Sequence, residues 1–358
     1  MATSRAGFVL RWPVLAARHR HSRANAVRQF VVILGLVLLL AGLMVWIRRD
    51  DSIAPGLGAG TIAARLVETE SLPRDLQAYA GLGTWVDGFD YGPAYTGGHP
   101  PIAPRDVDDM AAHGVKTLFL QAVRNDSRSP DGVVDRALVA EFLIRAHRAG
   151  IRVVGWYLPN FVDVARDVTD LKKIVDFDAG GHRFDGVAVD IEAVKDVPDV
   201  ADRNQRLIDL SSQLRAVSGR DALGAIVLPP VLTEVVNTSY WPDFPYSELA
   251  PIYNAWLPMS YWTFRSASSG YHDGYTYNDE STRRLRSDLG EPDAVVHGIG
   301  GIADTATTAE LDRFAQSLVE DHAVGGSIYD WNTLTPDARA HLEQLFGTGA
   351  AAHLAAPP

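Results

Sequence analysis

The segment from Phe184 to Glu192, FDGVAVDIE, ends with two carboxylates that are close enough to act on each other. Side chains alternate between the faces of a β-strand, so Ala188, Asp190 and Glu192 share one face and the intervening valines face the other way. Residues two apart on a strand lie about 6–7 Å apart, and like charges at this distance raise each other's affinity for protons. The pattern predicts that Glu192 stays protonated and acts as a general acid. The alternative is that both carboxylates only make structural hydrogen bonds at a strand end.

Polar and aromatic side chains also follow other apolar segments of the chain. Aromatic rings stack on the C–H faces of sugars, and carboxylates carry out acid–base chemistry, so this combination is typical of a carbohydrate site. We expect seven of these side chains to contact the sugar: Trp85, Asp87, Gln121, Tyr157, Trp262, Asp330 and Trp331.

Asp87 has a second interpretation, and three further polar residues, Asp90, Asn160 and His297, are associated with the apolar segments. Asp87 and Asp90 either bind sugar hydroxyls or cap the first loop, and Asn160 follows the third apolar segment. His297 is a lone histidine in an apolar segment, which favours a satisfied core residue over a ligand. Neither a His pair nor a His–carboxylate spacing suggests a metal site, and cysteine is absent, so Cys-ligated metals and thiolate nucleophiles are excluded.

The elements that must position these side chains form a repeating pattern. Eight short apolar segments recur at a spacing of about 35 residues, which is the length of a strand, a helix and two loops. We expect strands at 81–85, 115–120, 152–157, 186–191, 222–228, 255–259, 294–299 and 326–329. Helical stretches lie between them, at 104–113, 135–149, 202–217, 308–322 and 335–346, with Pro, acidic or Thr residues at their starts.

Eight strand–helix units over residues 75–346 predict an α/β fold, a (β/α)8 TIM barrel. Active sites of such barrels lie at the C-terminal ends of the strands, where the polar residues above are found. An open, doubly wound sheet is the alternative. It is disfavoured because Gly81-Leu-Gly83 is followed by Thr-Trp instead of a glycine-rich dinucleotide turn.

The N-terminal region differs sharply from the rest of the chain. Residues 1–49 hold eight arginines and no acidic residue, and residues 30–47, FVVILGLVLLLAGLMVWI, contain no charge. Eighteen helical residues span about 27 Å, enough for a slightly thin membrane core. Six arginines precede this segment, so we expect residues 1–29 in the cytoplasm, a single transmembrane helix at 30–47 that contacts the lipid bilayer, and an extracytoplasmic remainder. A cleaved signal peptide is the alternative.

Two further segments lack a sustained pattern. Residues 48–74 are rich in small and turn residues and are predicted to form a linker, and residues 347–358 are predicted to be a disordered tail. The whole chain has 33 basic and 44 acidic residues, a formal net charge of −11. This balance argues against nucleic acid as a partner.

The segment at 184–192 resembles the Asp-x-x-Asp-x-Asp-x-Glu signature of the family 18 chitinase-like glycoside hydrolases. Asp185, Asp190 and Glu192 match the first Asp, the third Asp and the catalytic Glu, whereas Ala188 occupies the second Asp position. Two further segments are similar to the family. Met259-Ser-Tyr261-Trp262 resembles its Met-x-Tyr-Asp, with Trp in place of Asp, and Trp331 resembles the Trp that floors its sugar subsite.

The resemblance implies a retaining, substrate-assisted mechanism with no cofactor. Glu192 would protonate the leaving oxygen, and the N-acetyl carbonyl of the substrate would attack the anomeric carbon. Asp190 and Tyr261 would orient that acetamide. Most other retaining barrel glycosidases need a second carboxylate about 5–5.5 Å from the acid, and the seventh predicted strand offers none.

The sequence therefore predicts a membrane-anchored, extracytoplasmic glycoside hydrolase that acts on an N-acetylated polysaccharide, such as peptidoglycan or another envelope glycan. Two alternatives remain open. One is a catalytically weak or inactive barrel that binds glycan through Trp85, Tyr157, Trp262 and Trp331. The other is a two-carboxylate glycosidase that uses Glu192 with Asp330 or Asp87.

Overall fold

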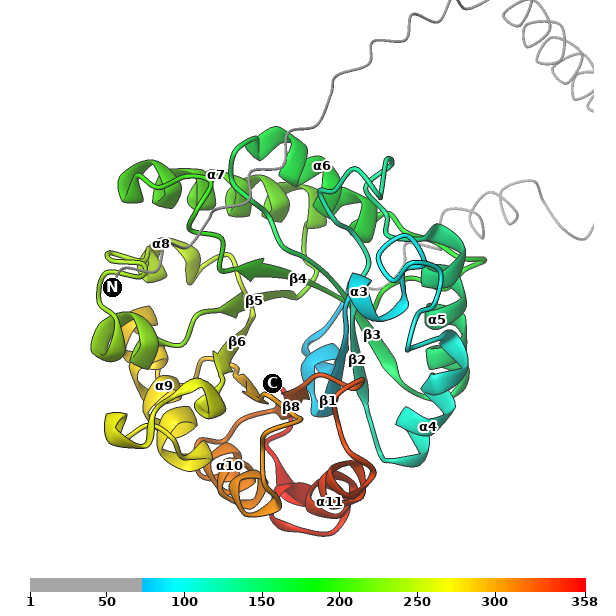
Figure 1. Cartoon of the computed structure of the whole chain (residues 1–358). Helices are drawn as coiled ribbons and strands as arrows, with labels where there is room; N and C mark the ends of the chain where they lie inside the picture. Colours follow the sequence, from blue (N-terminus) through cyan, green and yellow to red (C-terminus); the bar gives the residue numbers. More distant parts are fainter. Residues whose placement is uncertain (1–72) are drawn as a thin grey trace, which may run out of the picture. The chain divides into compact units, whose positions relative to one another are not determined.

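A computed structural model of the chain describes residues 73–358, in which eight parallel strands form a closed barrel (Figure 1). Each strand pairs with the next in sequence, and β1 closes the barrel by pairing with β8. The predicted (β/α)8 architecture is confirmed. The strands are β1 Gly81–Val86, β2 Thr117–Gln121, β3 Arg152–Tyr157, β4 Gly186–Ile191, β5 Leu223–Val227, β6 Ala255–Ser260, β7 His297–Gly301 and β8 Gly325–Tyr329.

Helices between the strands surround the barrel (Figure 1). The α-helices are α3 Gly88–Tyr91, α4 Val107–Ala112, α5 Arg136–Arg148, α6 Val164–Val175, α7 Val200–Ser218, α8 Tyr246–Leu249, α9 Gly274–Leu289, α10 Thr308–Glu320 and α11 Pro336–Gly347. Short 3₁₀ or π turns are η1 Leu76–Tyr79, η2 Pro104–Asp106, η3 Val231–Val236, η4 Trp262–Phe264, η5 Ala267–Ser269 and η6 Ala350–His353.

Capping residues account for several helix starts that the sequence predicts. The Asp135 carboxylate accepts hydrogen bonds from the first backbone N–H groups of α5, and Thr307 and Glu310 form a reciprocal capping box at α10. Thr335 caps α11. These side chains satisfy N–H groups that have no partner inside the helix, which sets where each helix begins.

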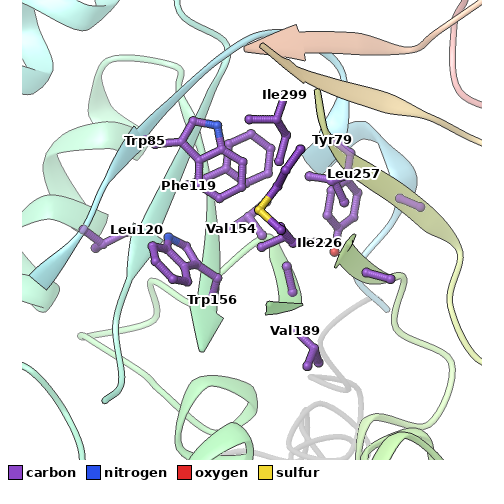
Figure 2. Close-up of a cluster of buried hydrophobic side chains, with 14 of the residues drawn as sticks. Tyr79, Trp85, Phe119, Leu120, Val154, Trp156, Val189, Ile226, Leu257 and Ile299 are labelled. Atoms are coloured by element: carbon purple, nitrogen blue, oxygen red, sulfur yellow. The ribbon is translucent and has the colours of Figure 1, made fainter. Parts of the chain in front are cut away.

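Because side chains alternate along each strand, those on one face of every strand point inward and fill the barrel interior. Trp85 on β1 stacks on Phe119 on β2, with ring centroids 4.3 Å apart, and Trp156 on β3 meets Trp85 edge-on at 5.9 Å (Figure 2). Ile226 on β5 and Ile299 on β7 belong to the same cluster. The side chains on the other face of each strand pack toward the helices.

The N-terminal end of the barrel is closed by Tyr79, the last residue of η1. Its hydroxyl donates a 2.9 Å hydrogen bond to the carbonyl of Val187, and its own carbonyl accepts one from Nδ1 of His297 at 2.7 Å. A Cβ on Gly224 would approach Cε1 of Tyr79 to 2.7 Å, so the Tyr79 ring occupies the space that this glycine leaves open. The floor of the barrel is therefore solid, and a ligand can enter only from the opposite end.

Two chain segments differ from their predictions. β7 begins at His297, three residues later than expected, because Ala294 still belongs to the turn closed by its hydrogen bond to Glu291. Residues 347–358 were expected to form a disordered tail, but η6 packs on the barrel with Ala351 buried, and Ala355 N donates a hydrogen bond to the carbonyl of Ala323. Small apolar residues make this packing possible where a turn-rich composition suggested none.

The cytoplasmic segment 1–29, the transmembrane segment 30–47 and nearly all of the linker 48–74 lie outside the described residues. Within residues 73–358, no helix is both long and apolar enough to cross a membrane. Near the start of the described residues, Arg74 pairs with Asp221 and donates to the carbonyls of Phe184 and Val175 at the N-terminal end of the barrel.

Candidate active site

A groove runs across the C-terminal ends of the strands and consists of three adjoining hollows. The central hollow, about 390 Å³, is lined by residues on or just after all eight strands and contains both Asp190 and Glu192. A second hollow of about 480 Å³ adjoins it and shares Glu192, Met259, Tyr261 and Phe264 with it. A third, of about 210 Å³, adjoins the other side of the central hollow. Glu192 and Tyr261 therefore lie at the junction of the two larger hollows.

Asp190 and Glu192 face this groove from the end of β4, as the alternation predicts. Burial raises the pKa of Glu192, and it raises the pKa of Asp190 further above its usual range, with the charge of Glu192 as the second cause. Asp190 is 7% exposed, and its Oδ1 accepts no hydrogen bond within residues 73–358. Raised pKa values favour the protonated forms, and a general acid must be protonated.

The level below Asp190 is apolar, because Ala188 replaces a carboxylate there. Ala188 is fully buried and lies in register with Trp156 on β3 and Gly224 on β5. Asp190 therefore has no acidic neighbour beneath it with which to share a proton, and Glu192 is its close acidic neighbour. Asp185, the first position of the signature, precedes β4 at the other end of the barrel, where it accepts hydrogen bonds from Val153 N and His147.

Tyr261 approaches the two carboxylates from the end of β6. Burial is the main cause that raises the pKa of its hydroxyl well above the usual range, and the charges of Asp190 and Glu192 raise it further. Its ring meets Tyr329 and Phe264 at centroid distances of 6.0 Å each. The hydroxyl stays protonated and is available as a hydrogen-bond donor beside the acidic pair. The structure thus brings together all three residues predicted to be catalytic.

Trp85 forms one wall of the central hollow, as predicted, and a chain of hydrogen bonds fixes it. Its Nε1 donates to Ser327 Oγ at 2.8 Å, and that hydroxyl donates to Nε2 of His297 at 3.0 Å. Because Nδ1 of His297 donates to a carbonyl, Nε2 must be the acceptor. Burial lowers the pKa of His297 to about 4, so the ring is neutral. His297 is therefore a satisfied core residue, the reading that the sequence favoured.

The loop after β1 contributes Asp87 to the groove and keeps Asp90 beneath it. Asp87 caps α3, and Asp90 accepts a 2.9 Å hydrogen bond from the Asp87 backbone N–H. Burial, and next the charge of Asp87, raises the pKa of Asp90 to about 7. Gln121 lines the groove as predicted and uses its Oε1 to accept hydrogen bonds from Gly88 N and Arg124. Asp87 caps α3 and also lines the groove, and its contact with sugar hydroxyls stays a prediction.

Tyr157 was predicted to contact the sugar, but the structure places it outside the groove. Its hydroxyl donates to Asp167 Oδ1 of α6 at 2.5 Å, and its side chain is fully buried on the outer face of β3. Trp156, the preceding residue, lines the central hollow instead. The prediction missed this because both faces of a strand in a parallel barrel are apolar. Asn160 does lie in the groove, in the third hollow.

Trp262 and Trp331, also predicted to bind sugar, are buried elsewhere. The Trp262 ring packs between β7 and α10, 5.3 Å from the Phe314 ring, in space that Gly300 leaves free. Trp331 is 2% exposed and lies under the guanidinium of Arg339, 4.1 Å from its ring centroid. Neither side chain lines the groove. The family resemblance implied that Trp331 floors a sugar subsite, and its position in the structure does not agree with that role.

Asp330, proposed as a second catalytic carboxylate, also does not line the three hollows. Its Oδ1 accepts hydrogen bonds from the backbone N–H and the hydroxyl of Thr333, both at 2.9 Å. These bonds close the turn after β8. Burial raises its pKa. In this part of the groove Tyr329, the preceding residue, faces the cavity instead.

Several groove residues were not singled out from the sequence. Large apolar side chains that are exposed to solvent gather here: Phe264 is 63% exposed, Phe89 47% and Tyr240 36%. Exposed aromatic rings along a groove provide stacking surfaces for sugar rings. They lie in loops beyond the strand ends, where periodicity carries no signal. Two arginines, Arg124 and Arg265, also line the groove.

The groove offers acid–base groups without a metal site. Across residues 73–358, no cluster of three or more His, Cys, Asp or Glu side chains is arranged to hold a metal ion. An acid whose pKa is raised by burial, a buried carboxyl beside it and a tyrosine hydroxyl can together donate protons and hydrogen bonds to one bound molecule.

Comparison with known proteins finds similarity at the level of structure. No protein-family profile matches the chain, and no curated protein sequence matches it. An endo-1,4-β-D-mannanase from Thermotoga petrophila is 10% identical with a TM-score of 0.53, over 70% of this chain and 88% of the mannanase. The C-terminal domain of a putative chitinase from Desulfitobacterium hafniense is 12% identical with a TM-score of 0.53, over 76% and 99%.

A family 18 chitinase from Cycas revoluta, solved in complex with (GlcNAc)4, is 11% identical with a TM-score of 0.51, over 74% of this chain and 98% of the chitinase. These neighbours are glycoside hydrolases, and family 18 chitinases are among them. The likeness shows that the fold is shared. It agrees with the resemblance seen in the residues of β4.

Proposed function

We propose that this chain is a glycoside hydrolase in which Glu192 protonates the leaving oxygen of a polysaccharide bound along the groove. The observation that carries the proposal is the position of Glu192, at the junction of two hollows with Asp190 and Tyr261 beside it. A polymer that occupies both hollows would present one glycosidic bond to Glu192. The raised pKa of Glu192 supports its role as the proton donor.

We further propose that the substrate supplies the nucleophile. The Glu192 proton would pass to the glycosidic oxygen as the C1–O bond breaks, and the acetamide carbonyl oxygen would bond to C1. Water would then attack C1, return the electron pair to the acetamide oxygen and give its proton to Glu192. Asp190 and Tyr261 would hold the acetamide for attack. Asp330 does not face the groove, which removes one of the two alternative second carboxylates.

Asp87 is the second candidate for that role, because it lines the same hollow as Glu192. In that mechanism Asp87 would act as nucleophile or base, and the substrate would need no N-acetyl group. Two hydrogen bonds already hold Asp87, from Phe89 N and from the Tyr329 hydroxyl, which favours the substrate-assisted mechanism.

The decisive experiment compares an N-acetylglucosamine hexasaccharide with its de-N-acetylated counterpart, using the full chain in detergent. We expect hydrolysis of the first with retention of anomeric configuration, and binding without turnover of the second. Glu192→Gln should slow hydrolysis by about 10²–10⁴. Glu291→Gln, which alters an exposed glutamate before β7 at the other end of the barrel, is the matched control.

Two outcomes would replace the proposal. Cleavage of the de-N-acetylated glycan would support the two-carboxylate mechanism. Binding of both glycans with no turnover of either would support a glycan-binding barrel.

We also propose that residues 30–47 anchor the chain in the cell membrane, with residues 1–29 in the cytoplasm and the barrel on the outer side. The uncharged run and the preceding arginines support this topology. Protease added to intact cells should then degrade the barrel. Complete protection of the region after residue 50 would contradict the topology.

A further inference from the structure

The groove carries two arginines whose charge is not neutralised by a neighbouring carboxylate. Arg124 lines the central and third hollows, and Arg265 lines the second hollow. They therefore lie on the two sides of Glu192, which contributes to both larger hollows. We propose that the groove takes an anionic glycan, whose sugar carboxylates are bound by Arg124 and Arg265. This inference rests on the proposed function, because it concerns the substrate of the same site.

Arg265 is the clearer case. Its guanidinium makes no ion pair or hydrogen bond within residues 73–358, and its Nε is buried without a partner. Its nearest aromatic neighbour is Tyr277, whose ring centroid lies 5.9 Å from Cζ. A half-buried guanidinium without a partner is costly, because its N–H groups have lost water and gained no acceptor. A carboxylate from the ligand would supply the missing acceptors.

Arg124 is held in place but not neutralised. One Nη donates to the amide oxygen of Gln121 at 2.7 Å, and the guanidinium stacks on Phe89 and Tyr95 at 4.5 and 5.3 Å. Its Nε is also buried without a partner. The nearby Asp126 forms its ion pair with Arg128, not with Arg124. The side chain is thus oriented by neutral groups, and its charge remains available.

Several other arginines of the barrel form ion pairs with carboxylates. Arg74 pairs with Asp221, Arg284 with Glu234 and Glu280, and Arg339 with Asp109. The chain carries 44 acidic residues against 33 basic ones, so acidic partners are plentiful. Arg124 and Arg265 form no such pair within residues 73–358, although both line the groove. The planar guanidinium also matches a carboxylate through two parallel hydrogen bonds.

Within residues 73–358, the acidic residues of the groove form no ion pair with either arginine. Burial raises the pKa values of Asp190 and Glu192, which favours their neutral forms, and the two oxygens of Asp87 accept hydrogen bonds from Phe89 N and the Tyr329 hydroxyl. Asp196 lines only the third hollow. A glycan with a carboxylate on sugars at both sides of the cleaved bond would therefore meet one arginine in each direction. Alternation of N-acetylated and carboxylated sugars satisfies both this pattern and the proposed mechanism.

The test measures binding to the full-length Glu192→Gln protein in detergent, so that turnover does not interfere. The probes are a neutral N-acetylglucosamine hexasaccharide, a hyaluronan hexasaccharide and a peptide-free hexasaccharide of alternating N-acetylglucosamine and N-acetylmuramic acid. We expect at least one acidic probe to bind about tenfold or more tightly than the neutral one, with a preference that shrinks as salt rises. The two acidic probes distinguish a ring carboxylate from a lactyl carboxylate.

Arg124→Gln and Arg265→Gln, added singly, should each reduce affinity for the acidic probe by a larger factor than affinity for the neutral probe. Arg124→Lys keeps the charge and should retain part of the preference, which guards against a folding defect. Arg220→Gln is the matched control, since Arg220 is exposed and precedes β5 at the opposite end of the barrel.

Equal or weaker binding of both acidic probes would overturn the inference, as would an equal effect of Arg220→Gln or no binding of any probe. Different outcomes test the proposed function separately from the preference for acidic glycans. If wild-type protein hydrolyses none of the probes but the acidic preference depends on both arginines, the groove binds anionic glycans without cleaving them. If it hydrolyses the neutral probe as well as the acidic ones, the enzyme stands and the charge preference falls.

Discussion

The hydroxyl of Tyr329, the last residue of β8, donates a 2.7 Å hydrogen bond to Oδ2 of Asp87, which follows β1. This bond joins the two strands that close the barrel, at the edge of the groove. Asp87 Oδ1 meanwhile accepts from Phe89 N at 2.6 Å. Both oxygens of Asp87 are thus engaged before substrate arrives, whereas the Glu192 carboxyl accepts no such hydrogen bond within residues 73–358. Asp87 and Glu192, two of the three carboxylates in the central hollow, are therefore set up for different roles.

Asp87→Asn and Tyr329→Phe test this assignment. Each removes or weakens one hydrogen bond, worth about 0.5–1.5 kcal/mol, so we expect hydrolysis to fall by no more than about tenfold in either variant. Asp330→Asn should have a smaller effect on rate, because its carboxylate closes a turn outside the groove. Measurement of kcat/KM on the N-acetylated hexasaccharide checks all three. A loss of about 10³ or more in Asp87→Asn alone would identify Asp87 as the second catalytic carboxylate.

The pH dependence of hydrolysis should reflect the buried acid. Burial raises the pKa of Glu192 above its ordinary value of 4.5, and only the protonated form can act as the general acid. We therefore expect kcat/KM to fall as pH rises through a pKa that lies above 4.5. A pH–rate profile over pH 4 to 9 measures it. An alkaline limb centred at or below 4.5 would contradict the burial of Glu192 in the working enzyme.

Asp190→Asn should increase stability while it lowers activity. The pKa of Asp190 is raised in the folded state, chiefly by burial, so the folded protein retains a proton that the unfolded chain releases. The wild type therefore loses stability as pH rises above the unfolded pKa of Asp, near 3.9. The Asp190→Asn variant does not lose stability in this way, because asparagine does not titrate. Urea unfolding at pH 4 and pH 7 should show a gain for Asp190→Asn that is larger at pH 7.

Asp108→Asn is a control of opposite sign for this experiment. Asp108 is exposed, and its hydrogen bond with Arg145 lowers its pKa, so the charged carboxylate stabilises the folded state. The loss of stability in Asp108→Asn should be present at pH 7 and shrink as pH falls through the lowered pKa. If Asp190→Asn behaves in the same way as Asp108→Asn, the carboxyl of Asp190 is solvated in the folded protein.

Adjacent residues on β3 provide a paired test of the groove. Trp156→Leu removes an aromatic wall of the central hollow and should weaken oligosaccharide binding by about threefold to tenfold. Tyr157→Phe leaves the groove intact but deprives Asp167 of a buried donor, which should cost about 1–3 kcal/mol of stability without changing affinity. Titration calorimetry and urea unfolding measure the two effects. If Tyr157→Phe weakens binding and Trp156→Leu does not, Tyr157 and not Trp156 lies in the site.

Several parts of the site were predictable because their signals are local. The strand at 186–191 was predicted at its observed bounds, and two acidic residues among valines identified which face of it points inward. The N-caps of α5 and α11 were readable for the same reason, since each depends on one side chain and the next few backbone N–H groups.

Tyr157, Trp262 and Trp331 were misplaced for a common reason. All three are aromatic residues at or just after a strand end, and an aromatic residue there packs equally well toward the groove or toward the helices. The choice depends on neighbours distant in sequence. Asp167 takes the Tyr157 hydroxyl, Gly300 and Phe314 make room for Trp262, and Arg339 covers Trp331.

By itself, the sequence determined the (β/α)8 barrel, the inward face of β4 with Asp190 and Glu192, and the uncharged run at 30–47 on which the proposed membrane anchor depends. These follow from periodicity and charge along a few neighbouring residues. Only the tertiary structure decided which side chains form the groove walls and that Arg124 and Arg265 keep their charges unpaired. Those properties arise where loops from different strands meet, and the contacts that create or withhold a partner there join residues far apart in the chain.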